Sequence, residues 1–110
     1  MTLQDVQKDI HNQITRDYDG RSRNTIQQMM VLGLVEEAGE VAGIFKRVHR
    51  NFERDRSHIT KEHLIEELGD VLWYLTALCD SHDITLEDIY EKNVKKLEAR
   101  YGQHKSSETL

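Results

Sequence analysis

Two short acidic segments hold the residues whose types and spacing could do chemistry. The first, Glu36 to Glu40, reads Glu-Glu-Ala-Gly-Glu, and the second, Glu67 to Asp70, reads Glu-Leu-Gly-Asp. Residues three or four positions apart share one face of an α-helix, so each segment presents its carboxylates together. Both segments are flanked by apolar residues at helical spacing, which indicates that the acids lie beside the buried faces of two helices.

Such a concentration of negative charge requires a compensating cation. Like charges on one face repel each other, and an unpaired carboxylate is costly to bury. Carboxylate oxygens are hard ligands that suit Mg²⁺ or Mn²⁺ better than Zn²⁺. Mg²⁺ keeps several waters and takes phosphate oxygens as further ligands, which points to a phosphorylated substrate. Gly39, Gly43 and Gly69 are predicted to let the helix backbones approach closely enough for both segments to reach one ion.

Other chemistries are less well supported. A single Glu-Glu-x-x-Glu segment is usually a solvated helix face, but two acidic pairs among apolar residues are not typical of one. No histidine lies four residues from another, and His63 has no Glu three residues before it. The Glu-x-x-His pattern of di-iron carboxylate bundles is therefore missing. The lone Cys79 cannot form an internal disulfide and is expected to be a small core residue.

The elements that carry these residues are predicted to be α-helices throughout. Apolar residues recur at helical spacing nearly everywhere, and the sequence contains no proline that would interrupt a helix. The first helix is expected to begin after Thr2, its N-cap, and to end before Asp17. The second is expected to run from about Thr25 to Arg50, with Asn24 and Gln27 as its capping pair.

The remainder of the chain is expected to add two helices. Residues 51–59 are charged without apolar periodicity and are predicted to be a surface loop. Thr60 is expected to cap a third helix that ends at about Cys79, and Thr85 to cap a fourth. The fourth helix should stop at Gly102. We therefore expect one helical domain over residues 1–102, followed by a frayed polar tail over residues 103–110.

The composition limits the classes of function. A chain of 110 residues is long enough for one domain, and 37% apolar residues with a mean hydropathy of −0.70 favour pairing with a second copy. A net charge of −5 argues against nucleic acid as a partner, because phosphates reward clustered positive charge. No apolar run is long enough for a membrane span, and the first ten residues do not resemble a signal peptide. The prediction is a cytoplasmic protein without a membrane partner.

With these acidic segments, the sequence resembles the MazG-like all-α nucleoside triphosphate pyrophosphohydrolases. Their pattern is Glu-Glu-x-x-Glu, a variable gap, then Glu-x-x-Asp, which here falls at Glu36 to Glu40 and Glu67 to Asp70. The likeness covers about Thr25 to Tyr101, and the segment Lys92 to Tyr101 resembles the family's closing Asn and Lys segment. It implies a four-helix bundle-like MazG fold completed by oligomerisation, as a homodimer or homotetramer.

The resemblance also implies an activity and a metal site. The activity is Mg²⁺-dependent hydrolysis of a nucleoside triphosphate between its α and β phosphates, giving the monophosphate and pyrophosphate, with Mn²⁺ as a substitute cation. Carried over by position, the metal ligands are Glu37, Glu40, Glu67 and Asp70. Glu36 is expected beside Glu37 in catalysis, where it supports the site or orients the attacking water.

Polyphosphate needs positive or hydrogen-bonding groups beyond the metal. Asn93, Lys96 and Arg100 are spaced to share one face of the fourth helix and are candidate phosphate contacts, although basic residues near a helix C-terminus also suit the helix dipole. Lys46 is a further candidate. Tyr74 follows Asp70 by one turn, so that it either borders the base of the nucleotide or belongs to the core.

Two alternatives remain open at this stage. Within the same class, the chain could be a phosphoribosyl-ATP pyrophosphohydrolase, which uses the same helical carboxylate arrangement. In a different class, it could be a non-catalytic helical module whose acids bind a structural cation or a basic partner. Turnover of nucleoside triphosphates with release of pyrophosphate distinguishes these alternatives.

Overall fold

Four α-helices make up the chain in the computed structural model, which describes residues 1–50 and 59–108, and side chains of 1–48 and 59–102. They are α1 (Leu3–Asp17), α2 (Arg23–Arg50), α3 (Lys61–Ser81) and α4 (Leu86–Glu108). No strand occurs among these described residues. The predicted all-α class with four helices is confirmed, while the predicted loop over residues 51–59 lies almost wholly outside the described part of the chain.

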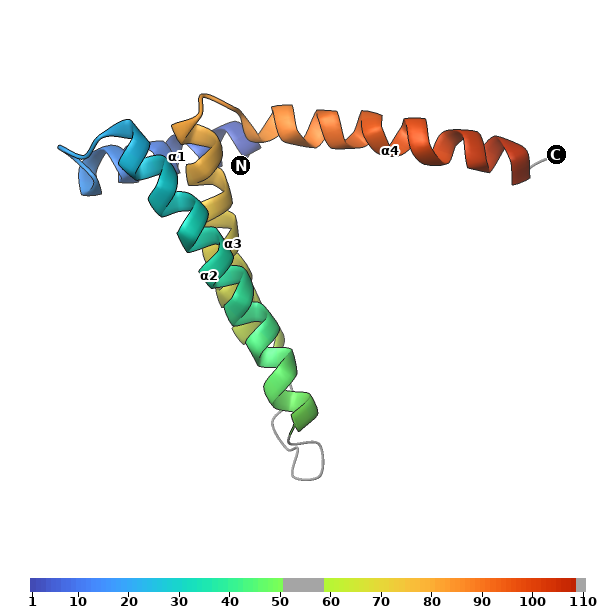
Figure 1. The fold of residues 1–110 in the computed structure, drawn as a ribbon, viewed down its shortest axis with the longest axis horizontal. Coiled ribbons are helices and arrows are strands. Elements are labelled where there is room, and N and C mark those ends of the chain that lie inside the picture. The colour runs from blue at the N-terminus through green and yellow to red at the C-terminus, as the bar shows by residue number, and fades with distance from the viewer. Residues whose placement is uncertain (51–58, 109–110) are drawn as a thin grey trace.

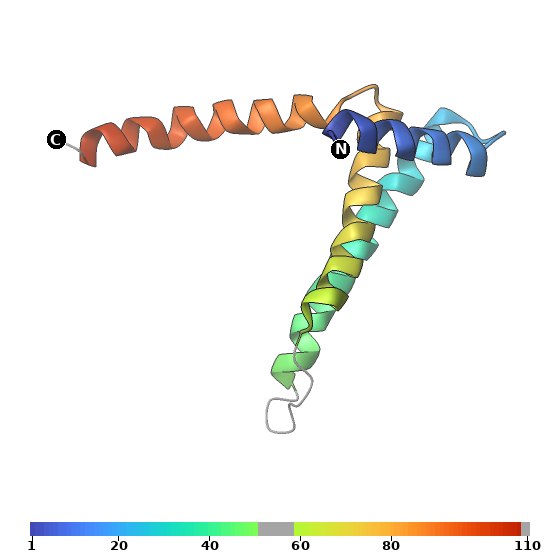
Figure 2. The ribbon, with the colours of Figure 1, turned by 180° about the vertical axis from the view of Figure 1, so that it is seen from behind.

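The helices are arranged as one long pair with a helix across its end and another leading away. α2 and α3 pack side by side along most of their length, running in opposite directions (Figures 1 and 2). α1 crosses the end of this pair where α3 finishes, and α4 then leaves at a steep angle to it. The beginning of α4 packs against α1. Within a single chain α4 therefore does not close a bundle with α2 and α3.

Three of the four helix starts follow the sequence signals. The side-chain oxygen of Thr2 accepts a hydrogen bond from the Asp5 N–H, and the Asp5 carboxylate accepts one from the Thr2 N–H, which completes a capping box. The Thr60 hydroxyl caps α3 by accepting from the His63 N–H. Thr85 caps α4 with Asp88 as its reciprocal partner. The hydrogen bonds confirm all three predicted caps. The sequence could predict them since each cap is formed by residues three positions apart.

The start of α2 differs from the prediction. The helix begins at Arg23, and the Ser22 hydroxyl accepts the N–H of Thr25 at 3.1 Å, so the expected capping pair of Asn24 and Gln27 is wrong. The side-chain amide of Gln27 instead donates to the carbonyl of Ser81 at 2.9 Å. The side chain that the local pattern assigned to the helix cap therefore makes a long-range hydrogen bond to α3.

The end of α4 also differs from the prediction. The helix continues through Gly102 to Glu108, so the predicted stop at Gly102 is wrong. Gly102 does not adopt the left-handed conformation that ends helices; among the described glycines only Gly20 has a positive φ, of 84°. No proline follows Gly102. A glycine in helical conformation weakens a helix without ending it.

The core is small and lies where α1 crosses the α2–α3 pair. Ile10 and Ile14 of α1, Met30 of α2 and Ala77 of α3 form its buried centre. The buried Cys79 lies near this end of α3, as expected for a small core residue. The radius of gyration is 18.4 Å, against about 13 Å for a compact domain of 100 residues. Much of the chain's apolar surface is therefore left uncovered.

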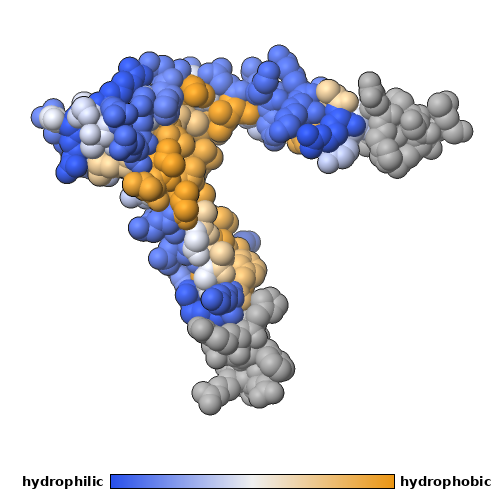
Figure 3. Space-filling view, viewed as in Figure 1, coloured by the Kyte–Doolittle hydropathy of each residue, from blue (hydrophilic) through white to orange (hydrophobic). Residues whose placement is uncertain are grey.

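Uncovered apolar surface lies across the α2–α3 pair and continues onto the beginning of α4 (Figure 3). Exposed large apolar residues occur on all three helices, and those of α3 and α4 are Ile65, Leu68, Leu72, Ile89, Tyr90, Leu97 and Tyr101. None of the helices in the described ranges is both long and apolar enough to cross a membrane.

Candidate metal centre

The packing of α2 against α3 brings three carboxylates to one place. Glu37 of α2 and Glu67 and Asp70 of α3 each offer one oxygen, and these oxygens lie within 4.8 Å of one another. Glu67 and Asp70 are three residues apart and so share a face of α3, while α2 supplies Glu37 from the opposite side of the pair. Three of the four predicted metal ligands are thus gathered by two helices that are distant in sequence.

The neighbouring carboxylates affect the pKa of one member of the cluster. The pKa of Glu37 is raised above its ordinary value, first by loss of hydration and then by the charges of Asp70, Glu36, Glu67 and Glu40. Three hard oxygen donors that repel each other are the donor set that a divalent cation such as Mg²⁺ neutralises. The residues of the cluster fit such an ion.

Glu40 and Glu36 lie at the edge of this cluster. Glu40, the fourth predicted ligand, is exposed one turn further along α2 and is not among the three gathered oxygens. It still contributes to the raised pKa of Glu37, although less than Asp70, Glu36 and Glu67 do. Glu36 is also exposed and lies next to Glu37 in the chain. Both carboxylates surround the cluster without belonging to its centre.

One residue beside the cluster was not expected from the sequence. His63 lies one turn before Glu67 on α3, and its Nε2 is 3.4 Å from Oε1 of Glu67. A His followed four residues later by Glu belongs neither to the Glu-x-x-His pattern nor to a pair of histidines. The spacing of four residues was the available signal, because it places both side chains on one face of a helix.

Close approach of the two helices depends on a glycine other than those predicted. A Cβ at Gly39 or Gly69 would meet nothing within 4 Å, and one at Gly43 would meet only the guanidinium of Arg47, so the predicted role of these glycines is wrong. A Cβ at Gly33 would instead lie 2.1 Å from Cε1 of Tyr74. The two helices are therefore close at Gly33, one turn before Glu37.

Tyr74 lies between the core and the acidic cluster. Its ring packs against the buried core and meets Trp73 edge to face, with ring centroids 5.1 Å apart. Its pKa is raised, first by burial and then by nearby Tyr18, Glu37, Glu36 and Asp70. The hydroxyl is thus within the field of the carboxylates, while the ring serves the core.

The predicted phosphate contacts are not brought to the acidic cluster within one chain. Lys46 is exposed nine residues beyond Glu37, which at about 100° per residue places it on the other side of α2. Asn93 and Lys96 line a shallow hollow on α4 together with Asp88, and Arg100 is exposed further along the same helix. Since α4 leads away from the α2–α3 pair, these groups do not reach the carboxylates of their own chain (Figure 1).

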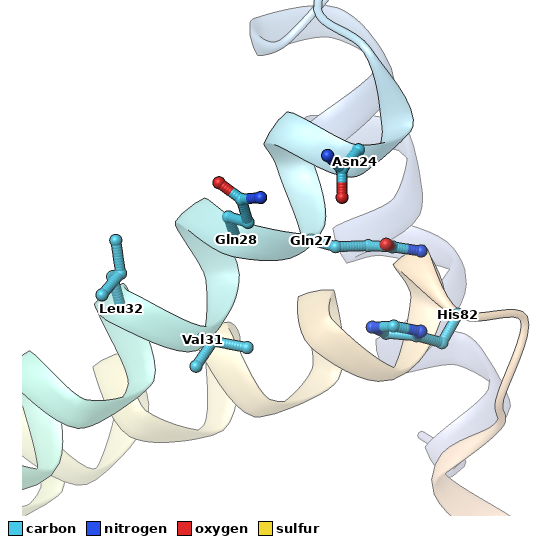
Figure 4. Close-up of a pocket in the computed structure, with 6 residues that line it drawn as sticks. All are labelled: Asn24, Gln27, Gln28, Val31, Leu32 and His82. Atoms are coloured by element: carbon cyan, nitrogen blue, oxygen red, sulfur yellow. The ribbon is translucent and has the colours of Figure 1, made fainter.

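A separate hollow between α2 and the end of α3 contains none of the predicted site residues. It is lined by Asn24, Gln27, Gln28, Val31, Leu32 and His82. Figure 4 shows Gln27 and His82 near each other at one end of it and the apolar Val31 and Leu32 towards the other. It carries no carboxylate that could hold a divalent cation.

Comparisons with known proteins cover the part of the chain that contains the acidic cluster. The sequence profile of the MazG nucleotide pyrophosphohydrolase domain matches residues 25–104, which include both acidic segments, Tyr74 and the candidate residues of α4. The Gene 37 protein of Mycobacterium phage L5 is 35% identical over 71 residues, 64% of this chain and 62% of that protein. The chain therefore spans less than two thirds of the phage protein.

Two proteins of Bacillus subtilis strain 168 are also similar. The uncharacterized protein YvdC is 36% identical over 73 residues, which cover 62% of this chain and 69% of YvdC. The uncharacterized protein YpjD is 29% identical over 101 residues, which cover 90% of this chain and 86% of YpjD. No solved structure gives a significant match.

Proposed function

The chain belongs to the family of MazG nucleotide pyrophosphohydrolase domains, and we propose that it hydrolyses nucleoside triphosphates to monophosphates and pyrophosphate. The observation that carries this proposal is the approach of one oxygen each from Glu37, Glu67 and Asp70 to within 4.8 Å. Membership of the family suggests pyrophosphohydrolase activity, and the cluster supplies the metal-binding groups which that chemistry requires.

The proposed cofactor is Mg²⁺, with Mn²⁺ as a substitute. Glu37, Glu67 and Asp70 would hold it, and Glu40, one turn away on α2, is the proposed fourth ligand. Oxygen ligands alone favour Mg²⁺ and Mn²⁺ over softer cations. When bound, the cation neutralises phosphate charge and lowers the pKa of a coordinated water.

The proposed reaction is attack of water between the α and β phosphates. The water oxygen forms a bond to phosphorus, the bridging P–O bond breaks, and pyrophosphate leaves with the electron pair of that bond. A carboxylate must orient the water and accept its proton. We assign this role to Glu36, because it is exposed and adjacent to Glu37, so that it can face the solvent side of the cluster.

A second copy of the chain is proposed to complete the site, in a homodimer or homotetramer. The exposed apolar residues of α2, α3 and α4 need a partner surface, and α4 holds its basic face away from its own acidic cluster. Asn93, Lys96 and Arg100 are therefore proposed to contact phosphate in the assembled protein. Tyr74 would border the nucleotide through its hydroxyl. Lys46 is also proposed to contact phosphate, although it lies on the other side of α2 from Glu37.

Turnover tests the proposed function. Purified protein with Mg²⁺ and a panel of canonical and modified nucleoside triphosphates is expected to release pyrophosphate. Asp70→Asn should lower kcat/KM by at least 100-fold, and the matched control Glu66→Gln, an exposed acid on the same helix outside the cluster, should not. The 100-fold threshold corresponds to about 2.7 kcal/mol of lost transition-state stabilisation.

Three results would contradict the proposal in different ways. Absence of pyrophosphate with every substrate, together with an unchanged melting temperature on adding Mg²⁺ or Mn²⁺, would favour a non-catalytic module. Full activity of Asp70→Asn would refute the site assignment while leaving the activity. If light scattering shows a monomer and this monomer hydrolyses nucleoside triphosphates, the proposed role of the second copy is refuted.

A further inference from the structure

His63 extends the acidic cluster by one helical turn towards the start of α3. Its Nε2 lies 3.4 Å from Oε1 of Glu67, and positions 63, 67 and 70 are spaced to share one face of the helix. Side chains in an α-helix lean towards its N-terminus, so the carboxylate of Glu67 leans towards His63. The contact therefore involves a carboxylate of the cluster itself.

The backbone beneath His63 is held in place by the helix cap. Its N–H donates to the Thr60 hydroxyl at 3.1 Å, and Thr60 is the N-cap of α3. A capped first turn frays less than an uncapped one. The imidazole is thus attached to an ordered part of the helix although its ring is about half exposed, at 47%.

Helix stability does not explain a histidine at this position. A charged imidazole in the first turn opposes the helix dipole, which favours acidic groups there. The partner carboxylate of Glu67 is 22% exposed, and pairs between partly exposed side chains four residues apart contribute little to stability. The contact therefore affects the Glu67 carboxylate more than it affects the stability of the helix.

We infer that His63 is a positioning residue: its Nε2 lies within ion-pair distance of one oxygen of Glu67 and attracts that carboxylate into an orientation towards Glu37 and Asp70. This inference rests on the proposed function of the cluster. Carboxylates that repel each other turn apart unless a neighbouring donor holds them, and a partner of this kind typically changes metal affinity by 10- to 100-fold.

Two substitutions distinguish an effect of the His63 side-chain N–H from an effect of side-chain size. His63→Ala removes the donor, and His63→Gln restores a side-chain N–H of similar reach. His82→Ala is the matched control, because it removes an exposed imidazole from the other end of α3, away from the cluster. Binding of Mn²⁺ alone, without nucleotide, is measured by titration calorimetry on the full chain.

The expected result is about tenfold weaker Mn²⁺ binding by His63→Ala, recovery of most of the affinity in His63→Gln, and wild-type affinity in the control. The melting temperature without metal should be the same in all four proteins. The Mg²⁺ concentration for half-maximal rate of pyrophosphate release should rise in His63→Ala and stay at the wild-type value in His82→Ala.

The outcomes distinguish this inference from the proposed function. Wild-type Mn²⁺ affinity in His63→Ala would overturn the positioning role and leave the function standing. An equal loss in His63→Ala and His63→Gln would also overturn it, because the amide restores the donor. A wild-type protein that neither binds Mn²⁺ nor releases pyrophosphate would overturn the proposed function, and this inference with it.

Discussion

The ring of Tyr74 lies so close to the backbone of Gly33 that a Cβ at residue 33 would stand 2.1 Å from Cε1 of the ring. Gly33 precedes Glu37 by one turn of α2, and Tyr74 follows Asp70 by one turn of α3. This contact therefore brings the helices together immediately beside the carboxylate cluster. The contact between Gly33 and Tyr74 and the carboxylate cluster therefore lie next to each other along the α2–α3 pair.

Gly33→Ala is expected to destabilise the protein. The added methyl group must displace Tyr74 or separate the helices, and overpacking of this kind costs about 1–3 kcal/mol. The better helix propensity of alanine offsets up to about 1 kcal/mol of this. Urea denaturation should show the net loss. Gly69→Ala is the control: its Cβ would meet nothing within 4 Å, so it should be neutral or stabilising, and a Gly33→Ala variant as stable as this control would contradict the packing argument.

Neutralising one carboxylate of the cluster should reduce the stabilisation of the protein by metal. Glu37→Gln removes a group whose pKa is raised by burial and by neighbouring acids, so the metal-free protein should melt at the same or a higher temperature than wild type. The increase in melting temperature on adding Mg²⁺ should become smaller or disappear. Differential scanning calorimetry with and without Mg²⁺ measures both. An unchanged Mg²⁺-dependent increase would show that Glu37 is not a ligand.

Acid should weaken the start of α4 through Asp88. The Thr85 N–H donates to the Asp88 carboxylate at 3.0 Å and lowers its pKa below 3.8. Because the folded protein holds the carboxylate ionised, this contribution is fully present at neutral pH and is lost as the pH falls below the ordinary pKa of an aspartate and through the lower, folded pKa. Asp88→Asn should therefore show a smaller loss of unfolding free energy below pH 4.

The acid dependence is measured by urea denaturation at a series of pH values from 7 to 2. Glu91→Gln removes a carboxylate from the next turn of α4 and serves as the charge control, which should retain the wild-type profile. Identical profiles for Asp88→Asn and wild type would refute the assignment of this part of the acid sensitivity to the cap.

The direction in which α4 leaves the molecule is expected to depend on Gln7. Its side-chain amide donates to the Ile84 carbonyl at 2.8 Å and accepts the Leu86 N–H at 2.9 Å, so that α1 holds both sides of the turn into α4. Gln7→Ala should cost about 1–3 kcal/mol, because Leu86 is buried and its N–H would lose its partner. Hydrogen exchange of the Leu86 amide should become faster than in Gln4→Ala, an exposed control on the same helix. Unchanged exchange would contradict this role.

Local signals predicted the features that depend on local contacts. Thr2, Thr60 and Thr85 cap their helices because a cap is formed by residues three positions apart. The same periodicity placed Glu67 and Asp70 on one face and so predicted most of the acidic cluster. The signals failed at Gln27, which bonds to Ser81 of another helix, and at Gly102, whose stop signal requires a left-handed conformation that the chain does not adopt.

The sequence by itself determined four helices and two sets of acids, because helical period and caps act within a few residues. Only the tertiary structure decided which oxygens meet, since Glu37 reaches Glu67 and Asp70 through the packing of α2 on α3 while Glu40 stays outside. It also decided the closeness of Gly33 to Tyr74 and the departure of α4 from the pair. These relationships join residues far apart in the chain, whose distances follow from packing and not from spacing.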